Sequence, residues 1–402
     1  MITKSKDLRT GRTIWEQNRA PGVPHRPLKR NIQTEVLVIG AGITGAMVAD
    51  ALTASGKTVV LVDRRGPAKG SSTASTALVQ YEIDTPLTKL SRMIGKTDAI
   101  RAFRRSRLAV DALAARLGEL GVPLQRRNTL YLAGNVLDAK GLKQECKLRH
   151  EAGLACRMVA KAELHELGVR SAAALMGYGD FTIDPRQATC ALLHAAYRRG
   201  ARIYSPVNIV DVDPKKTTVT AMTSAGHRIR AKHVVFATGY EFPKSVPQRG
   251  HQIASTWAIA TVPQKRKLWP GQHMIWQSAD PYLYLRTTPD GRVICGGEDE
   301  EFVDEDERDA LIERKTKKLQ HKLKKLMPAI DTRVDFAWAG SFGQTDTGLP
   351  TIGHIPRMPH CWAALGYGGN GTTYSRIAAE IIAGAIDGRP SLDADLYGFQ
   401  SK

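Results

Sequence analysis

The sequence has no long apolar run and only five cysteines in 402 residues. No stretch approaches the roughly 20 apolar residues that a membrane-spanning helix needs, so no transmembrane segment is expected. The first 30 residues hold eight Lys or Arg and no apolar segment, which argues against a secretory signal. The cysteines show no C-x-x-C or other metal spacing, so we predict reduced thiols, no metal site and a cytoplasmic protein. They are Cys146, Cys156, Cys190, Cys295 and Cys361.

Acidic residues are scarce relative to basic ones: 39 Asp and Glu face 58 Lys and Arg, a formal net charge of +19. This excess is compatible with nucleic acid, an anionic membrane surface or acidic partners, or simply with a basic solvated surface. Because no zinc finger, helix-turn-helix or RNA-binding signature accompanies it, we favour the solvated surface and do not expect a nucleic-acid partner. Residues 304–326 begin with acidic residues and end with lysines, and their apolar residues recur at helical spacing. We therefore predict one long helix whose end charges match the helix dipole and whose apolar stripe packs on the protein.

What the sequence does contain is a glycine-rich turn between two predicted strands near the N-terminus. Residues 36–39 form a short apolar run typical of a parallel strand buried on both faces. Gly40, Gly42 and Gly45 follow as G-x-G-x-x-G, and a helical pattern and a second β-branched strand lead to Asp63. Strand, turn, helix, strand and acid in this order predict a dinucleotide-binding site.

Each part of this motif has a physical role. Gly40 allows the tight turn, Gly42 lets the backbone approach a pyrophosphate, and Gly45 lets helix and strand pack closely. The N-terminus of the helix offers unpaired N–H groups and a positive dipole end to the phosphates. Asp63 is placed to accept hydrogen bonds from a ribose and would repel a 2′-phosphate, although Arg64 follows it. The motif alone does not separate FAD from NAD.

The segment before the fingerprint reads differently. Residues 1–33 are expected to form an irregular arm, because Pro21, Pro24 and Pro27 prevent a continuous helix. The arm either wraps the surface or docks a partner.

Three further blocks identify the cofactor. A hydroxyl-rich segment covers 70–84, a strand pattern ending in Ala-Thr-Gly covers 207–239, and one C-terminal block covers 338–353 and 364–379. Together with the fingerprint, and in this order, they resemble the D-amino-acid oxidase, glycine oxidase and sarcosine oxidase superfamily of FAD-dependent oxidoreductases. The resemblance extends over about residues 34–390.

The resemblance implies an α/β fold, α+β overall. A Rossmann-like FAD-binding domain is expected to be interrupted by a discontinuous mixed-β substrate domain that lies over the flavin. The expected parts are the N-terminal arm (1–33), FAD-binding segments at 34–87, 183–250 and 334–402, and substrate-domain segments at 88–182 and 251–333.

The family's FAD contacts carry over onto matching positions of this sequence. In some relatives a Cys or His is also linked covalently to the flavin. Here Phe342 and its neighbours stand where that Cys would be, and residues 71–74 lack the His, so we expect non-covalent FAD. The expected FAD contacts are Gly40, Gly42, Ile43, Thr44, Gly45, Asp63, Arg64, Ser71, Ser72, Thr73, Ser75, Thr76, Val207, Thr238, Gly239, Gly368, Gly369, Asn370, Gly371 and Thr372.

The chemistry that the resemblance implies is oxidation of a C–N bond. A neutral amine gives a hydride to flavin N5, and O₂ or another acceptor then takes the electrons. The flavin carries the hard step, so no catalytic acid or base is required. The helix that follows Gly371 is expected to direct its positive end toward the pyrimidine ring of the flavin, which is anionic when reduced.

The substrate side departs from the family pattern. Some relatives hold the substrate carboxylate with arginines, whose fork binds a carboxylate in two places, but residues 341–343 and 368–370 contain none here. Arg286 is expected either to supply a relocated carboxylate clamp or to form a surface salt bridge with the acidic residues 298–300. The pocket candidates are Gln80, Tyr81, Tyr284, Arg286 and Tyr367.

We therefore predict an FAD-dependent oxidase or dehydrogenase of an amine or N-substituted amino compound, including γ-glutamylated polyamines, with a small-molecule substrate. The missing arginines weaken simple D-amino acids and glycine as substrates. Two alternatives stay open. One is a flavin enzyme that acts on a modified nucleotide in RNA, which the basic charge would suit. The other is an electron-transferring subunit of a hetero-oligomeric amine dehydrogenase that docks through the basic arm.

Overall fold

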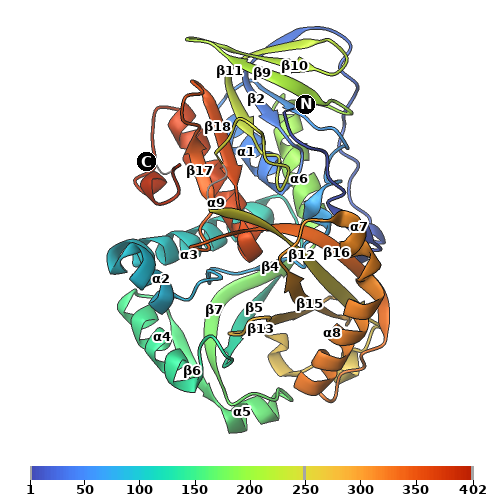
Figure 1. Cartoon of the computed structure of the whole chain (residues 1–402), viewed down its shortest axis with the longest axis vertical. Coiled ribbons are helices and arrows are strands. Elements are labelled where there is room, and N and C mark those ends of the chain that lie inside the picture. Colours follow the sequence, from blue (N-terminus) through green and yellow to red (C-terminus); the bar gives the residue numbers. More distant parts are fainter. Residues whose placement is uncertain (1, 248–249, 400–402) are drawn as a thin grey trace.

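The chain folds around two β-sheets, seen one above the other in Figure 1. The computed structural model describes residues 2–247 and 250–399. Within that part of the chain, no helix is both long and apolar enough to span a membrane.

The smaller sheet holds the glycine fingerprint. Its strands β11, β2, β3 and β8 run parallel, and β2 and β3 are apolar runs with buried cores, as expected for parallel strands covered on both faces. The strand order is β17 (Thr351–His354), β18 (Cys361–Leu365), β11 (Arg228–Phe236), β2 (Ile32–Ile39), β3 (Val59–Val62) and β8 (Arg202–Tyr204), and β9 (Ile209–Pro214) and β10 (Val219–Thr223) extend it from β11.

Three helices pack together beside this sheet. α1 (Ile43–Ala54) contacts both α6 (Pro185–Arg198) and α9 (Gly371–Ile386). The Asp184 side chain caps α6 by accepting hydrogen bonds from Arg186 N and Gln187 N, with Pro185 at the first helical position. α1 and α9 begin on the side that faces the larger sheet (Figure 1).

The larger sheet is assembled from segments that lie far apart in the sequence. Its order is β1 (Arg9–Gly11), β16 (Val334–Thr345), β12 (His251–Thr261), β15 (Val293–Glu300), β14 (Leu283–Thr287), β13 (Met274–Gln277), β5 (Leu124–Leu132), β7 (Ala173–Ile183) and β4 (Leu78–Val79), with β6 (Cys156–Ala160) paired to β7. The remaining helices are α2 (Leu87–Ile94), α3 (Lys96–Glu119), α4 (Ala139–Glu151), α5 (Lys161–Glu166), α7 (Glu305–Ala310) and α8 (Ile312–Leu326).

The lysine-rich segment differs from the single helix that its charge pattern predicts. It forms α7 and α8, which meet at Leu311. The buried Arg308 side chain ties α7 to the N-terminal arm by donating to the Asp7 carbonyl at 2.7 Å. α8 instead packs its buried leucines on β12, β15 and β16. The two helices therefore pack on different parts of the protein and do not continue as one.

Two segments at the ends of the chain also differ from expectation. An FAD-binding segment was expected to begin at residue 334. The strand β16 instead pairs within the larger sheet along its length, so the chain leaves that sheet only after Thr345. The N-terminal arm is not wholly irregular: β1 pairs with β16, and Trp15 is buried, with its indole N–H donating to the Ser75 carbonyl at 2.8 Å. The arm thus wraps the molecule.

Candidate active site

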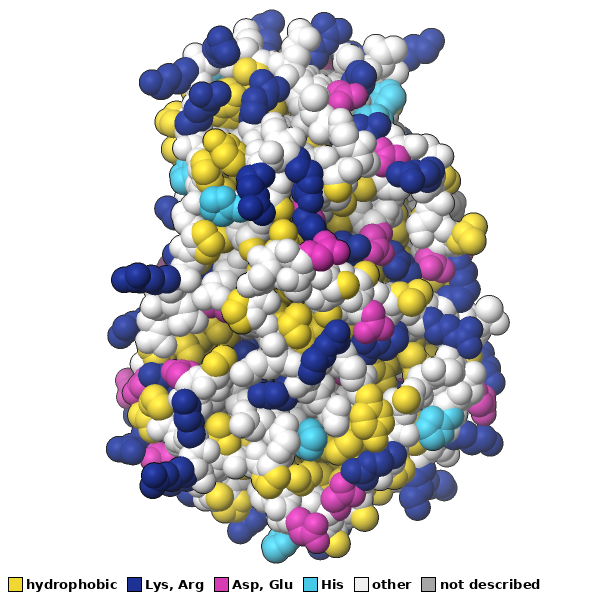
Figure 2. All heavy atoms as spheres, turned by 180° about the vertical axis from the view of Figure 1, so that it is seen from behind, with side chains coloured by type: hydrophobic (Ala, Val, Ile, Leu, Met, Phe, Trp, Pro, Cys, Tyr) yellow, Lys and Arg dark blue, Asp and Glu magenta, His cyan; other side chains and the backbone are white. Residues whose placement is uncertain are grey.

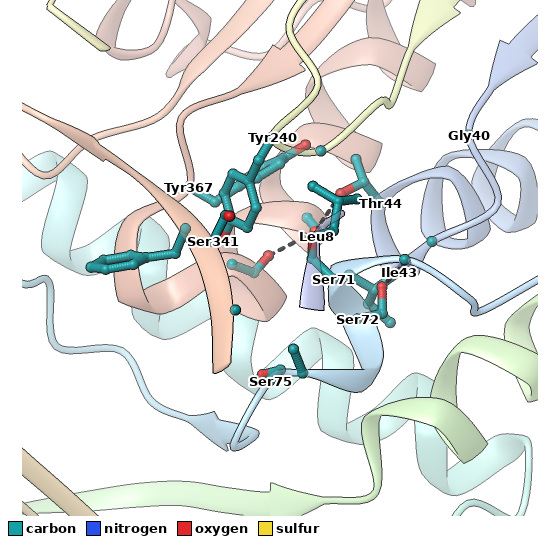
Figure 3. Close-up of a pocket in the computed structure, with 18 of the residues that line it drawn as sticks. Leu8, Gly40, Ile43, Thr44, Ser71, Ser72, Ser75, Tyr240, Ser341 and Tyr367 are labelled. Atoms are coloured by element: carbon teal, nitrogen blue, oxygen red, sulfur yellow. Dashed lines mark hydrogen bonds between the residues drawn. The ribbon is translucent and has the colours of Figure 1, made fainter. Parts of the chain in front are cut away.

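A cavity lies between the two sheets and is lined by residues from both of them. Figure 3 shows Ile43, Thr44, Ser71 and Ser72 gathered beside the glycine turn, with Tyr240, Tyr367 and Ser341 further along. The cavity therefore has one wall from the fingerprint and one from the larger sheet.

The glycine turn is shaped by close backbone packing. Gly40 has a φ of +114°, which L side chains rarely adopt, and an added Cβ would overlap the Ala237 carbonyl. An added Cβ at Gly45 would overlap the Gly40 carbonyl, so helix α1 can approach β2 only with glycine here. Both glycines are required for the turn itself.

The N-terminus of α1 is open toward the cavity. Its N-cap residue is Gly42, which has no side chain with which to cap the helix. Ser72 Oγ accepts the Ile43 N–H at 2.9 Å, and Gly42, Ile43 and Thr44 all line the cavity. N–H groups and the positive helix end in this position suit a pyrophosphate.

The far end of the fingerprint is closed by paired charges. Asp63 accepts hydrogen bonds from Ala41 N at 2.8 Å and from Arg65 N at 2.7 Å, which fixes its carboxylate beside the turn. Arg64 and Arg65 both form ion pairs with Glu241, and Arg64 also donates to the Thr3 hydroxyl of the arm. These arginines are engaged within the protein, so they do not favour a 2′-phosphate over a ribose hydroxyl.

A second helix N-terminus opens on the cavity, that of α9. The loop before it is held by residues 80–84: Gly369 N donates to Asp84 Oδ2 at 2.7 Å, and Thr373 Oγ1 donates to the Gln80 carbonyl at 2.9 Å. Thr44 and Ser375 join the two helices through a 2.8 Å hydrogen bond between their hydroxyls. The two positive helix ends thus lie on one cavity.

The structure brings most of the expected FAD contacts together. Gly45 and Thr73 do not line the cavity: Gly45 packs against Gly40, and the Thr73 hydroxyl donates to the Gly70 carbonyl at 3.1 Å. The expected contacts that line it are Gly40, Gly42, Ile43, Thr44, Asp63, Arg64, Ser71, Ser72, Ser75, Thr76, Val207, Thr238, Gly239, Gly368, Gly369, Asn370, Gly371 and Thr372. The donors and glycines of this set fit the phosphates and rings of FAD.

The end of the cavity under the larger sheet is aromatic and acidic. Its walls come from β12 to β16, and the Trp276 ring is held by stacking on Tyr131 at a centroid distance of 3.8 Å. The lining residues here are Thr256, Trp276, Tyr282, Tyr284, Asp299 and Phe342. Gln80 and Tyr367, both expected in the pocket, line the same cavity, as Tyr284 does.

Burial changes the ionisation of two carboxyl groups on this cavity. Burial raises the pKa of Asp299 to about 6, against the effect of the nearby Thr256 and Tyr282 hydroxyls. Burial also raises the pKa of Asp84, which the hydrogen bond from Gly369 N partly offsets. Burial raises the pKa of Tyr284 as well, so its phenol stays protonated.

Two pocket candidates are placed elsewhere. Arg286 is fully enclosed and donates to the backbone carbonyls of Ala77 at 2.9 Å and Ile183 at 2.7 Å, so it neither lines the cavity nor pairs with residues 298–300. Both alternatives for Arg286 are therefore wrong. Tyr81 lies behind the cavity wall, where the buried Arg149 guanidinium stacks on its ring at 5.8 Å.

Several cavity residues were not anticipated from the sequence. Asp299 was considered only as a partner for Arg286, and its signal would have been the four consecutive acids at 298–301, after Gly296 and Gly297 at the end of a strand. Other lining residues that were not expected come from segments distant in the sequence. They include Ile2, Thr3 and Leu8 of the arm, Asp84, Tyr240 and Tyr282 in loops, and Thr256 and Trp276 on strands.

The fold also joins cysteines whose spacing had suggested no metal site. Cys146 and His150, one turn apart on α4, lie beside Cys156 on β6, and the two sulfur atoms are 3.2 Å apart. The three possible ligand atoms lie within 4.8 Å of one another. His150 Nε2 lies 2.8 Å from the Cys156 carbonyl oxygen, and this group is separate from the cavity.

Comparison with known proteins gives one family. The model of the family described as DAO, FAD dependent oxidoreductase, matches residues 35–385. Glycine oxidase of Geobacillus kaustophilus is 23% identical over 88% of this chain and 93% of its own length. The tRNA 5-methylaminomethyl-2-thiouridine biosynthesis bifunctional protein MnmC of Cupriavidus necator is 26% identical over 96% of this chain, which spans only 62% of that relative.

Solved structures show the same fold. L-proline dehydrogenase from P. horikoshii superposes with a TM-score of 0.77 at 20% identity, over 92% of this chain and 97% of that one. Glycine oxidase from Geobacillus kaustophilus superposes with a TM-score of 0.75 at 20% identity, over 92% of this chain and 99% of that one.

Proposed function

Because the chain belongs to the FAD-dependent oxidoreductase family, we propose that it oxidises a C–N bond of an amine or N-substituted amino compound. FAD is the cofactor of this family, and it supplies the hydride acceptor when bound. The observation that carries the proposal is a cavity that joins the glycine turn and two helix N-termini to an aromatic, acidic end.

The protein residues have positioning roles in this proposal. The N-terminus of α1 and the Ser72 hydroxyl would hold the phosphates of FAD, and the N-terminus of α9 would stabilise negative charge on its reduced form. Trp276, Tyr284 and Phe342 wall the substrate end and exclude water from it. Transfer of a hydride from a neutral amine needs no catalytic acid or base from the chain.

We expect the FAD to be non-covalent. Among the described residues, neither a cysteine nor a histidine lines the cavity, and Phe342 stands at the position considered for a cysteine link. Acid precipitation of the holoprotein should therefore release all the yellow colour into solution. O₂ or another acceptor would take the electrons from the reduced enzyme.

Anaerobic reduction of the flavin tests the proposal. The holoprotein is mixed without oxygen with alkylamines, diamines, N-methyl amino acids and D-amino acids, and loss of the visible flavin band is followed. At least one amino compound should bleach it, and re-admission of air with peroxide detection then separates an oxidase from a dehydrogenase. Matched alcohols and 2-hydroxy acids are the control. Bleaching by these alone would contradict C–N oxidation.

A second candidate is a flavin enzyme that acts on a modified nucleotide in RNA. Two observations favour it: the similarity to a relative named for tRNA methylaminomethyl-thiouridine biosynthesis, and the net charge of +19. Figure 2 shows Lys and Arg spread along the whole of one face rather than gathered in one patch. Tight tRNA binding that weakens steeply with salt would support this candidate, and no binding at low salt would remove it.

A further inference from the structure

Strand β15 carries a β-bulge where it meets β12. Ser255 pairs with Glu300 and Trp257 with Gly297, so two residues of β15, Glu298 and Asp299, oppose one residue of β12. Glu298 has a φ of +63°, a left-handed conformation that costs energy for a non-glycine residue. Bulges of this kind redirect side chains and are frequent beside active sites.

The bulge decides which acid of the Glu298–Asp299–Glu300 run faces the cavity. An added Cβ at Gly296 would contact the Tyr284 ring, so position 296 faces the cavity. Strict alternation would next turn Glu298 and Glu300 inward. Because of the extra residue, Asp299 faces the cavity instead, and both glutamates face α8 on the other side of the sheet.

Lysines of α8 hold the two outward acids. Lys318 and Lys322 form ion pairs with Glu298, and their hydrogen bonds outweigh its burial and lower the pKa of that carboxyl. The buried Lys315 ammonium donates to the Glu298 carbonyl at 2.6 Å, pairs with Glu300 at 2.5 Å and lies over the Trp257 ring. The basic helix thus fixes the bulge from behind.

Asp299 forms no ion pair among the described residues, although Lys315 lies near enough to lower its pKa against the effect of burial. Both of its carboxylate oxygens are buried and form no short hydrogen bond among the described residues, although the Thr256 and Tyr282 hydroxyls lie near enough to lower its pKa as well. An isolated buried carboxylate is costly unless it is paired. The cationic side chains that line the cavity in the described structure are Arg64 and Arg65, and Glu241 pairs with both of them at the fingerprint end.

The substrate end is therefore selective by charge. Asp84 is the other carboxylate near Asp299 on this cavity, and its Oδ2 is already engaged by Gly369 N. A substrate carboxylate would meet two acids and no arginine here, whereas an ammonium group would meet Asp299 between the rings of Tyr282, Tyr284 and Trp276. These rings cover the carbon chain of an aminoalkyl group.

We propose that Asp299 is the specificity-determining residue of this cavity and holds a second, non-reacting ammonium group of a diamine-like substrate. This inference rests on the proposed oxidation of an amine. The nitrogen that is oxidised must be neutral, and a neighbouring carboxylate would keep its proton on. The cation at Asp299 is therefore a different nitrogen, which places the substrate among diamines or polyamines rather than amino acids.

Ligand binding to the holoprotein tests this inference without requiring turnover. Binding of 1,4-diaminobutane and of acetate is followed by perturbation of the visible flavin band in the wild type, Asp299→Asn and Glu301→Gln. The exposed Glu301, two residues away, controls for the same loss of net charge. We expect the wild type to prefer the diamine, and Asp299→Asn to weaken diamine binding about 30-fold or more. Glu301→Gln should stay within about twofold of the wild type.

The outcomes separate this inference from the proposed function. Tighter binding of acetate than of the diamine by the wild type, no diamine binding, or unchanged diamine binding in a folded Asp299→Asn overturns it. If Asp299→Asn does not retain FAD, the preference of the wild type for the diamine or for acetate decides whether the inference holds. Failure of every amine to reduce the flavin, with diamine binding intact, would instead count against the proposed oxidation.

Discussion

The two ends of the cavity recognise their ligands in different ways. The fingerprint end uses backbone N–H groups, hydroxyls and glycines from α1 and the segment after β3, all fixed by local packing. The end under the larger sheet uses side chains from five strands, of which Asp299 is charged and unpaired among the described residues. The fingerprint end can bind a polyanionic cofactor regardless of which substrate the protein uses. At the other end, a few side-chain substitutions would be enough to change the substrate specificity.

The support behind each end differs as well. The fingerprint end is held by contacts between backbone atoms, as at Gly45 and Gly40. The substrate end is held by buried cations that reach across the sheet, as Lys315 does at the bulge. Substitutions at the first end should therefore abolish cofactor binding, and substitutions behind the second should alter substrate binding while the cofactor remains.

The largest effect is expected at the glycine turn. In Gly45→Ala the new Cβ overlaps the Gly40 carbonyl, so α1 must move away from β2. We expect a loss of about 3 kcal/mol in the free energy of unfolding and of most bound FAD, measured by denaturant titration and flavin absorbance. Gly118→Ala is the control, because a Cβ there meets nothing within 4 Å. Full FAD content in Gly45→Ala would contradict the close-packing argument.

Arg286 offers the next largest effect and tests its structural role. Arg286→Met leaves the carbonyls of Ala77 and Ile183 without their donor in a buried position. We expect the free energy of unfolding to fall by about 2–3 kcal/mol, with the preference for diamine over acetate unchanged. Exposed Arg314→Met should alter neither quantity. A reversed ligand preference in Arg286→Met would show that Arg286 serves the pocket after all.

A smaller effect is expected behind the bulge. Lys315→Met removes the buried ammonium that holds the Glu298 carbonyl and Glu300. We expect a loss of about 2 kcal/mol in stability, weaker diamine binding and normal FAD content. Lys317→Met is the matched control, because Lys317 is exposed and pairs with Glu313 one turn away. If the two variants affected diamine binding equally, the bulge would have no influence on the substrate site.

The smallest effect is expected from pH. The pKa of Asp299 is raised to about 6 by burial, so its carboxylate is ionised above that value and protonated below it. Diamine binding should be strongest well above that value, while the amines remain protonated, and should weaken up to tenfold per unit as pH falls below it. The charged or titratable groups near Asp299 are Asp84, Tyr282, Tyr284 and Lys315. Asp299→Asn should lose this dependence, and an unchanged profile would exclude Asp299 as its source.

The sequence was a good guide to the fingerprint end. Gly40, Gly42 and Asp63 lie within 24 residues of one another, and each is constrained by a local turn or helix end that leaves a pattern in the sequence. The order of the later blocks then indicated FAD and the family, which the family match to residues 35–385 confirms. The proposed domain boundaries remain a prediction, although β16 belongs to the larger sheet.

The substrate end could not be predicted in the same way. Strand alternation alone would have turned Glu298 toward the cavity, and only the bulge against β12 selects Asp299. Arg286 shares its strand with Tyr284 two positions away, yet its guanidinium reaches the backbone of residues 76–77 instead of the pocket. The directions of these side chains depend on the pairing register of the strands and on contacts with segments that are distant in the sequence.

The central claim is that an acidic substrate end selects a cationic amine. The most direct measurement is the rate of anaerobic flavin reduction in the wild-type holoprotein, divided by the dissociation constant, for 1,4-diaminobutane and for N-methylglycine. The account predicts a larger value for 1,4-diaminobutane, because only this compound brings a second ammonium group to Asp299. A larger value for N-methylglycine, whose carboxylate should be repelled there, would contradict it.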